Sequence, residues 1–342
     1  MAAIVRPARA DDLDALYEMA KRAGGGFTNL PADRNALAER LARSAAAFAR
    51  DHDAIHDDVF LLMLEDRAEQ RIAGTAQIMA TVGERAPFHS YRRGILTQYS
   101  TELGRSFRTE MLSLTTDLEG STEVGGLFLH PYYRAGGLGL LLARSRYLFI
   151  RRHRARFADR VIAELRGVID EAGAAPFWDG IAGRFLSMDF READAFNAVN
   201  GHHAIASLMP KHPIYLAMLP DQARAVVGVP HPTGRAAMRM LEAEGFACDG
   251  YLDIFDGGPT MSVATDRIRT VQQAQEGRID RIDRIDAGAA AGVRSLIAAG
   301  MLDSFRAGFG IVSARDGTLA IDADTAEALA LRPGEPILHI PR

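Results

Sequence analysis

The chain has 342 residues and a net charge of −4, with 44 acidic residues against 40 Lys and Arg. This length exceeds a typical domain of about 100 to 200 residues, so a second module is expected. The negative charge disfavours nucleic acids and anionic membranes as partners. We expect a cytoplasmic protein, because no signal peptide or membrane-spanning run is visible and the single Cys248 has no partner for an internal disulfide.

The first part of the chain predicts strands and helices in alternation. Residues 4–7 predict an opening strand, and Asp11 and Asp12 are suited to begin the helix that follows. Apolar residues at 60–65 and 72–80 predict two adjacent strands joined by a polar loop. This order indicates a mixed α/β fold.

Residues 124–142, V-G-G-L-F-L-H-P-Y-Y-R-A-G-G-L-G-L-L-L, form the most informative segment. They predict an apolar strand and a glycine-rich loop that opens into a helix of residues 140–156. The first N–H groups of a helix lack partners inside it and its dipole is positive there, so an anion such as a phosphate is the expected occupant. The spacing matches neither a dinucleotide-binding loop nor a Walker loop.

Two further elements follow in the middle of the chain. Residues 161–165 predict a strand, and residues 236–241 predict a helix that ends in L-E-A-E-G-F. Gly245 in this ending is expected to adopt the left-handed conformation of a helix cap, which directs Phe246 back to the core.

The composition changes beyond residue 265. The repeated Arg-Ile-Asp run at 278–286 predicts a charged linker or an exposed edge strand. Residues 311–342 predict a strand, a turn, a second strand, a short helix capped by Asp322 or Asp324, and a final strand.

Several of these features resemble the GNAT superfamily of N-acyltransferases. Arg134-x-x-Gly137-x-Gly139 after a strand resembles the R/Q-x-x-G-x-G/A loop that holds the acyl-CoA pyrophosphate in that superfamily. The opening strand and helix resemble the start of such a domain, and residues 241–246 resemble the L-Y-E-K-x-G-F signature of its last helix. The resemblance implies a mixed α/β, GNAT-like core interrupted by a long insertion at about residues 167–234.

Longer motifs narrow the resemblance to the arginine N-succinyltransferase family. They are R-G-V-I-D-E, P-F-W, M-D-F, L-M-P-K-H-P-I-Y, Y-L-D-I-F-D-G-G-P-T and, near the start, G-G-G-F-T-N-L-P. This resemblance implies an enzyme of arginine catabolism that transfers succinyl from succinyl-CoA to the α-amino group of L-arginine, giving N2-succinyl-L-arginine and CoA. We expect residues 1–265 to form the acyltransferase domain and residues 266–342 a small β-barrel-like module.

The resemblance also implies where the reaction takes place. In GNAT enzymes a backbone amide of the strand before the loop polarises the thioester carbonyl, which points to Leu127 and the adjacent Phe128 and Leu129. Many GNAT enzymes use a Tyr of the last helix as acid–base group, but Leu241 stands here. The family resemblance points instead to His231, whose alternative role is only to precede the helix. The pyrophosphate is assigned to Arg134, Ala135, Gly136, Gly137, Leu138, Gly139 and Leu140.

The sequence leaves the acceptor site open. Lys211, His212 and Tyr215 lie in a Pro-flanked loop and are candidates to bind a carboxylate of either substrate. A guanidinium pairs with a carboxylate in bidentate geometry. The acids that could supply it are Asp170, Glu171, Asp189, Asp253 and Asp256, and a substrate loop at Phe27, Thr28 and Asn29 is a further candidate.

Other partners are few. Neither the pair His52 and His56 nor the pair His202 and His203 completes a metal-binding set, so no metal and no permanently bound cofactor is predicted. The expected partners are L-arginine, succinyl-CoA as co-substrate, and a second subunit in a homo- or hetero-oligomer, which the resemblance implies for some members. Two alternatives remain: a GNAT enzyme that uses ornithine or acetyl-CoA, and a non-catalytic CoA-binding subunit.

Overall fold

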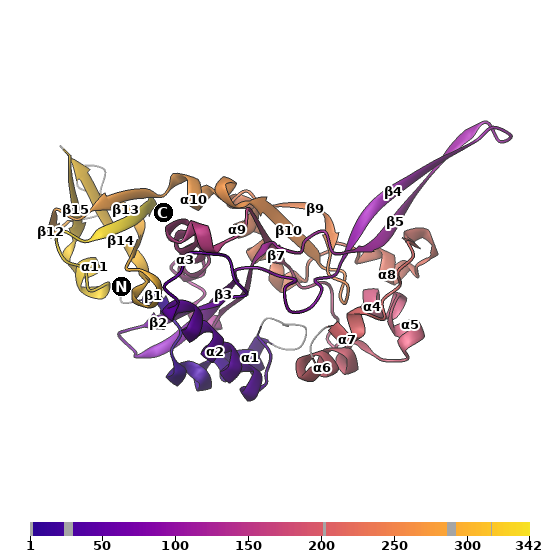
Figure 1. Cartoon of the computed structure of the whole chain (residues 1–342), viewed down its shortest axis with the longest axis horizontal. Coiled ribbons are helices and arrows are strands. Elements are labelled where there is room, and N and C mark those ends of the chain that lie inside the picture. Colours follow the sequence, from indigo (N-terminus) through magenta and orange to yellow (C-terminus); the bar gives the residue numbers. More distant parts are fainter. Residues whose placement is uncertain (1–2, 24–29, 201–202, 286–291, 316) are drawn as a thin grey trace.

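The computed structural model describes residues 3–23, 30–200, 203–285, 292–315 and 317–342. The strands of this described part form one sheet in the order β11-β16-β13-β14-β1-β2-β3-β6-β7-β10-β9-β4-β5-β8, with β12 paired to β15 and β15 to β14 (Figure 1). Helices pack against this sheet, so the predicted mixed α/β fold is confirmed.

The strands are β1 (Ala3–Pro7), β2 (Val59–Asp66), β3 (Arg71–Met79), β4 (Ser90–Ser100), β5 (Arg105–Thr115), β6 (Thr122–Leu129), β7 (Arg160–Glu164), β8 (Ile214–Tyr215), β9 (Ala247–Leu252), β10 (Pro259–Ala264), β11 (Gln275–Arg278), β12 (Arg281–Asp283), β13 (Val293–Ala299), β14 (Arg306–Arg315), β15 (Thr318–Asp322) and β16 (Pro336–Pro341). The helices are α1 (Leu13–Ala23), α2 (Arg34–Ala49), α3 (Leu138–Arg152), α4 (Pro176–Gly180), α5 (Gly183–Leu186), α6 (Phe190–Asn200), α7 (His203–Ala206), α8 (Asp221–Ala225), α9 (Arg235–Ala243), α10 (Arg269–Gln273) and α11 (Ala323–Ala328).

The molecule is elongated along the sheet (Figure 1). The C-terminal strands gather at one end beside the N-terminus, and the β4–β5 hairpin projects as a long arm from the other end. Helices α4 to α8 lie below the base of this arm, whereas α3 lies between the C-terminal strands and β7.

Helix α3 forms the middle of the main core. Its residues from Leu141 to Ile150 are all buried. Phe149 packs in near edge-to-face contact with Phe48 and Phe305, and in tilted contact with Phe60, at ring-centroid distances of 5.6, 5.1 and 5.0 Å. Aromatic pairs of this kind add to the free energy gained from burial alone. The helix that follows the glycine loop is thus held rigidly by the core.

The boundaries of α3 differ from the predicted range 140–156. The helix begins at Leu138, because Gly137 occupies the left-handed region at φ 84° and the turn closes directly onto it. It ends at Arg152, since His153 leaves the helical region at φ −121°. The glycine loop therefore leads directly into the helix, without the intervening residues that the apolar pattern indicated.

Two parallel strands separate beside this helix. Strand β6 pairs with β7 only through Thr122 with Val161 and Glu123 with Ile162, so the two strands diverge toward their carboxyl ends. On its other side β6 pairs with the antiparallel strand β3, and the register of this pairing shifts between Thr75 and Gln77. The divergence opens space between β6 and β7 and positions the site described below.

The predicted helix at 236–241 and its ending are confirmed. Helix α9 is followed by Gly245 at φ 98°, and Phe246 returns to the core with 3% of its surface exposed. Glu244 is buried and accepts hydrogen bonds from the Thr270 backbone and hydroxyl at 2.7 and 2.8 Å. It also pairs with the buried Arg144 of α3 at 3.2 Å, so the two helices are tied by a charged contact that supports their burial.

The C-terminal strands continue the same sheet, because β14 pairs with β1. The predicted short helix is α11, capped by Asp322, whose carboxylate accepts from the Thr325 N–H at 3.0 Å. Of the two alternatives for the charged run, the edge strand is correct, since β11 and β12 are strands on either side of the buried Ile279. The division at residue 265 stays a prediction.

The sequence did not reveal the β4–β5 hairpin or the helices α4 to α8. The hairpin carries apolar residues that remain exposed, among them Ile95, Tyr99 and Phe107, so no burial pattern marks it. The helices are short, and most offer too few turns for a helical period to emerge.

Candidate active site

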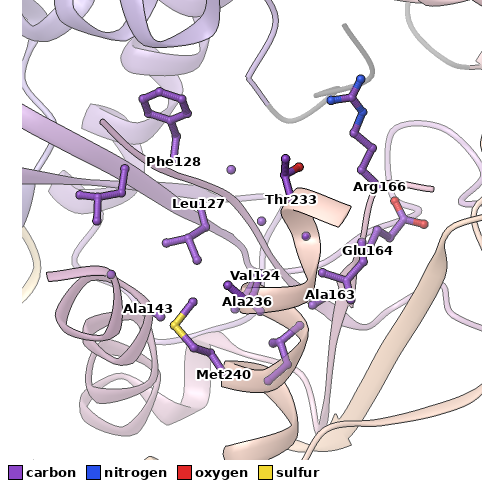
Figure 2. Close-up of a pocket in the computed structure, with 18 of the residues that line it drawn as sticks. Val124, Leu127, Phe128, Ala143, Ala163, Glu164, Arg166, Thr233, Ala236 and Met240 are labelled. Carbon is purple, nitrogen blue, oxygen red and sulfur yellow. The ribbon is translucent and has the colours of Figure 1, made fainter. Parts of the chain in front are cut away.

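A cavity of about 670 Å³ opens where β6 and β7 diverge. Its walls come from β6, the glycine loop, α3, β7, α6, α9 and the segment after β9. Figure 2 shows Leu127 and Phe128 on one side and Glu164 and Arg166 on the other. Thr233 lies between these two sides in that view. The cavity thus has two distinct walls, which meet near the start of α9.

The first wall contains a β-bulge at Leu127. Gly125 pairs with Gln77 and Phe128 with Thr75, so residues 126 and 127 form the extra segment of β6. Gly126 takes φ 55°, a left-handed conformation that a bulge requires and that glycine adopts at no steric cost. Neither β3 nor β7 pairs with Leu127, so its backbone is outside the ladder and borders the cavity.

The glycine loop continues this wall. Gly136 and Gly137 both have positive φ, at 66° and 84°, and lead into the first turn of α3, where Gly139 and Leu140 have no carbonyl four residues earlier in the helix. The predicted pyrophosphate residues all line the cavity except Gly136, whose carbonyl accepts from the Arg342 guanidinium at 2.6 Å. The loop therefore offers backbone N–H groups and the positive end of a buried helix to one cavity.

His231 stands where the two walls meet. Its backbone N–H donates to the Arg166 carbonyl at 2.8 Å, and its Nδ1 lies 2.7 Å from the Thr233 hydroxyl. The two Thr233 contacts suit different tautomers of the neutral ring: Nδ1 accepts from the Thr233 N–H at 3.3 Å when Nε2 carries the proton, and Nδ1–H donates to the hydroxyl when Nε2 is the free acceptor. Burial, followed by the nearby Arg166 charge, lowers the pKa of His231. A lowered pKa keeps the imidazole neutral at pH 7.

The second wall is acidic. Glu164 ends β7, and Asp253 and Asp256 follow β9. Burial and the neighbouring acids raise the pKa of Glu164 and of Asp256 well above their usual range. Asp253 Oδ1 accepts from the Phe255 and Asp256 N–H groups at 2.7 and 2.8 Å, so it is used to fold the loop.

Two glycines allow this acidic loop to approach β7. A Cβ on Gly167 would lie 2.2 Å from the Asp256 carbonyl oxygen, and one on Gly258 would lie 2.0 Å from the Leu165 carbonyl oxygen. Only glycine permits such close approach of two backbones. The motifs that begin at Arg166 and Tyr251 in the sequence therefore meet each other at the cavity.

Other predicted substrate residues lie away from the cavity lining. Lys211 and His212 are exposed, and Tyr215 pairs with Met111 at the edge of the sheet. Asp170 closes a turn by accepting from the Ala174 N–H at 2.8 Å. A substrate role for these four residues stays a prediction that the cavity does not support. The predicted loop at 27–29 lies outside the described residues.

The sequence missed several polar residues of the cavity, three of which are candidates to bind the substrate. Glu164, Arg166 and Asn197 all line it. Arg166 stands at the start of a motif that was recognised, whereas Glu164 ends an apolar strand and Asn197 lies in a helix that the sequence did not predict. Their positions depend on the packing of β7, α6 and the loop after β9.

Comparison with known proteins identifies the family. Residues 3–270 match the family model described as arginine N-succinyltransferase beta subunit, and residues 278–341 match the model of its C-terminal domain. The chain belongs to the arginine N-succinyltransferase beta subunit family. This membership confirms the resemblance seen in the sequence, and members of this family and their structural relatives are acyltransferases.

Individual relatives agree with this assignment. The chain is 42% identical over 272 residues to the arginine N-succinyltransferase subunit beta of Pseudomonas aeruginosa, with 80% of this chain and 79% of that protein covered. It is 40% identical, with the same coverage, to the arginine N-succinyltransferase of Citrobacter koseri. The solved structure of arginine/ornithine succinyltransferase subunit AI from Pseudomonas aeruginosa is 30% identical and has a TM-score of 0.89 over 99% of this chain and 98% of that one.

Two further properties of the described residues concern metal ions and membranes. No cluster of three or more His, Cys, Asp or Glu side chains in the described ranges is arranged to hold a metal ion. Among the helices of the same residues, none has the length and apolar character needed to cross a membrane. Cys248 is exposed and is not part of the cavity.

Proposed function

We propose that this protein is an arginine N-succinyltransferase that transfers succinyl from succinyl-CoA to the α-amino group of L-arginine and releases CoA. One observation carries the proposal: a single cavity brings together the bulged strand at Leu127, the glycine loop at the start of α3, and His231. An acyltransferase that works by direct transfer needs all three within reach of one acyl-CoA molecule.

The CoA thioester binds along the first wall. The pyrophosphate lies against the loop of residues 134–140, where backbone N–H groups and the helix dipole stabilise its charge. The pantetheine follows β6, and the thioester carbonyl accepts a hydrogen bond from the backbone at Leu127, beside Phe128 and Leu129. This donor stabilises the oxyanion that forms when the amine attacks.

His231 relays the proton in this reaction. The amine nitrogen attacks the thioester carbon, a C–N bond forms, and the carbonyl oxygen becomes an oxyanion. His231 Nε2 takes the proton that the amine loses in the tautomer whose Nδ1–H donates to the Thr233 hydroxyl, and the lowered pKa keeps the ring neutral. The oxyanion then collapses, the C–S bond breaks, and His231 gives the proton to the departing thiolate. Amide and free CoA thiol balance the reaction.

We further propose that the protein is cytoplasmic, that residues 1–265 form the acyltransferase domain, and that residues 266–342 form a C-terminal module. The contact between Arg342 and Gly136 supports a stabilising role of this module on the pyrophosphate loop. We also propose that the protein associates with a second subunit, because its relative from Pseudomonas aeruginosa is named subunit beta.

A thiol-release assay tests the proposed function. The purified protein is incubated with succinyl-CoA or acetyl-CoA, each combined with arginine or ornithine, and free CoA is measured. The proposal predicts the highest kcat/KM for succinyl-CoA with arginine. A preference for acetyl-CoA or for ornithine would indicate another acyltransferase, and no release with any pair would indicate a CoA-binding subunit.

A further inference from the structure

Glu164 and Asp256 bring two carboxyl groups to the cavity, and neither is held in an ion pair with a described residue. Within the described part of the chain, no Lys, Arg or His side chain forms an ion pair with either carboxylate. One oxygen of Asp256 accepts from the Gly258 N–H at 2.8 Å, and only 5% of this residue is exposed. Asp256 is buried and Glu164 is partly buried, and carboxylates in such positions are normally paired, so a cationic ligand would supply a partner that the described residues do not.

Asn197 gives a second, independent indication of a ligand. It lines the same cavity from α6 and is 5% exposed, yet its Oδ1 has no hydrogen-bond partner among the described residues. Phe190 and Asp194 lie on the same face of α6 at helical spacing and also line the cavity. A buried amide oxygen that lacks a donor is costly, and an N–H group of a bound molecule would satisfy it.

Arg166 lies at the boundary between the acids and His231. The His231 backbone N–H donates to its carbonyl, and the Arg166 charge contributes to the lowered pKa of His231. The Nε of Arg166 is buried without a hydrogen-bond partner among the described residues, and no ion pair holds its guanidinium there. An anionic group bound to Arg166 would therefore lie next to the proton relay.

The acceptor pocket, which consists of Glu164, Arg166, Asn197 and Asp256, matches the two ends of an amino acid with a cationic side chain. We propose that Arg166 binds the α-carboxylate of the acceptor and that Glu164 and Asp256 bind its side-chain cation, with Asn197 accepting one of its N–H groups. This inference rests on the proposed function and adds the recognition of the amine substrate to it.

The orientation follows from the chemistry of the substrate. The α-amino and α-carboxylate groups share one carbon, so the residue that holds the carboxylate must neighbour the residue that takes the amine proton. Arg166 satisfies this condition, because its backbone contacts His231 and its charge is close enough to lower the pKa of the imidazole. The guanidinium then extends toward the acids, where bidentate pairing with a carboxylate adds geometric specificity.

Acceptor binding should also depend on pH. Burial comes first among the causes that raise the pKa of Glu164, followed by the charges of Asp253, Glu123 and Asp256. Arg166 also faces this pocket, within electrostatic reach of Asp256 and Asp194. The other charged residues that line the cavity are Arg22, Arg134, Arg144, Arg146 and Glu244. A bound guanidinium favours the ionised carboxylates, so binding releases protons. Arginine affinity is therefore expected to increase with pH until the acids are ionised in the free protein.

The experiment measures kcat and KM at saturating succinyl-CoA for three acceptors with the same α-amino group. Arginine has both charges, citrulline lacks the side-chain cation, and argininamide lacks the carboxylate. Glu164→Gln is expected to reduce the arginine-to-citrulline ratio of kcat/KM about 30-fold, because it removes a charge-assisted contact. Arg166→Gln is expected to reduce the arginine-to-argininamide ratio by a similar factor. Glu164→Asp, which keeps the charge, should retain much of the first ratio.

Glu84→Gln is the matched control, since this acid is exposed and does not line the cavity. It should leave both ratios unchanged. Unchanged ratios in Glu164→Gln and Arg166→Gln, with an active wild type, would overturn the inference while leaving the proposed function intact. A loss confined to kcat with the same loss for all acceptors would also overturn it. An inactive wild type would instead reject the proposed function, and thermal unfolding of each variant separates misfolding from lost recognition.

Discussion

The two walls of the cavity are built in different ways. The first wall, from Leu127 to Leu140, presents backbone groups: a bulge, two glycines with positive φ, and the start of a buried helix. The second wall presents side chains. Glu164 and Arg166 lie at the end of β7 and just after it, and His231, where the two walls meet, lies beyond most of the long insertion. We interpret the first as the binding surface for the CoA part, which every donor shares, and the second as the surface that selects and activates the amine.

This difference predicts separate effects on kinetics. A change in the first wall should weaken succinyl-CoA binding, because the loop geometry positions the backbone N–H groups. A change in the second wall should alter turnover or acceptor selection, because we propose that those side chains contact the amine. Variants of each wall therefore test whether the division is real.

The largest effect is expected for His231→Ala. Removal of the proton relay should lower kcat about 100-fold or more while KM for succinyl-CoA stays near the wild-type value. Steady-state CoA release measures both constants. His56→Ala is the matched control, because His56 is exposed and does not line the cavity. Near-normal turnover of His231→Ala would remove this residue from the mechanism.

The pH profile gives the same prediction a second readout. Because burial and Arg166 lower the pKa of His231, the ring stays neutral down to a pH below its usual value of about 6.5. Activity should therefore be retained at pH 7 and fall as the pH drops through this lowered pKa. In Arg166→Gln the fall should begin at higher pH. A profile that is identical in both proteins would contradict the coupling between these residues.

A smaller effect is expected for Gly137→Ala. Alanine at φ 84° strains the loop, and its Cβ would lie 2.1 Å from the Arg342 guanidinium, so this exposed side chain must move and lose its contact with Gly136. KM for succinyl-CoA should increase about tenfold, with kcat much less affected. Gly120→Ala is the control: its φ of 73° carries similar strain, but its Cβ meets nothing within 4 Å and it does not line the cavity. Equal changes in KM for both variants would show that strain alone is responsible.

The contrast between the walls also explains which parts of the site could be predicted from the sequence. The first wall is continuous in the chain, so the strand, the glycines and the helix were predictable from local pattern and family resemblance, apart from the exact helix start at Leu138. The second wall depends on long-range contacts. Gly167 and Gly258 meet only because β7 and β10 pair, and this contact brings Asp256 beside Glu164. No local spacing in the sequence records it.

The same limit applies to the candidates that the cavity does not support. Lys211 and His212 were selected because a Pro-flanked loop with charged residues is a frequent place for a site. Such a pattern indicates that the side chains are exposed but not whether they face the cavity. Both residues are exposed and neither lines the cavity. His231 was selected through the family resemblance, and its neighbours Thr233 and Arg166 became apparent only in the structure.

Ornithine provides the most direct measurement of the central claim, that the second wall orients the amine substrate. Its α- and δ-amino groups are both able to attack a thioester, so only the orientation in the pocket decides which one reacts. With succinyl-CoA and ornithine, mass spectrometric fragmentation or NMR of the product locates the new amide. The account predicts succinylation of the α-nitrogen, with Arg166 holding the carboxylate beside His231. Succinylation mainly at the δ-nitrogen would contradict it.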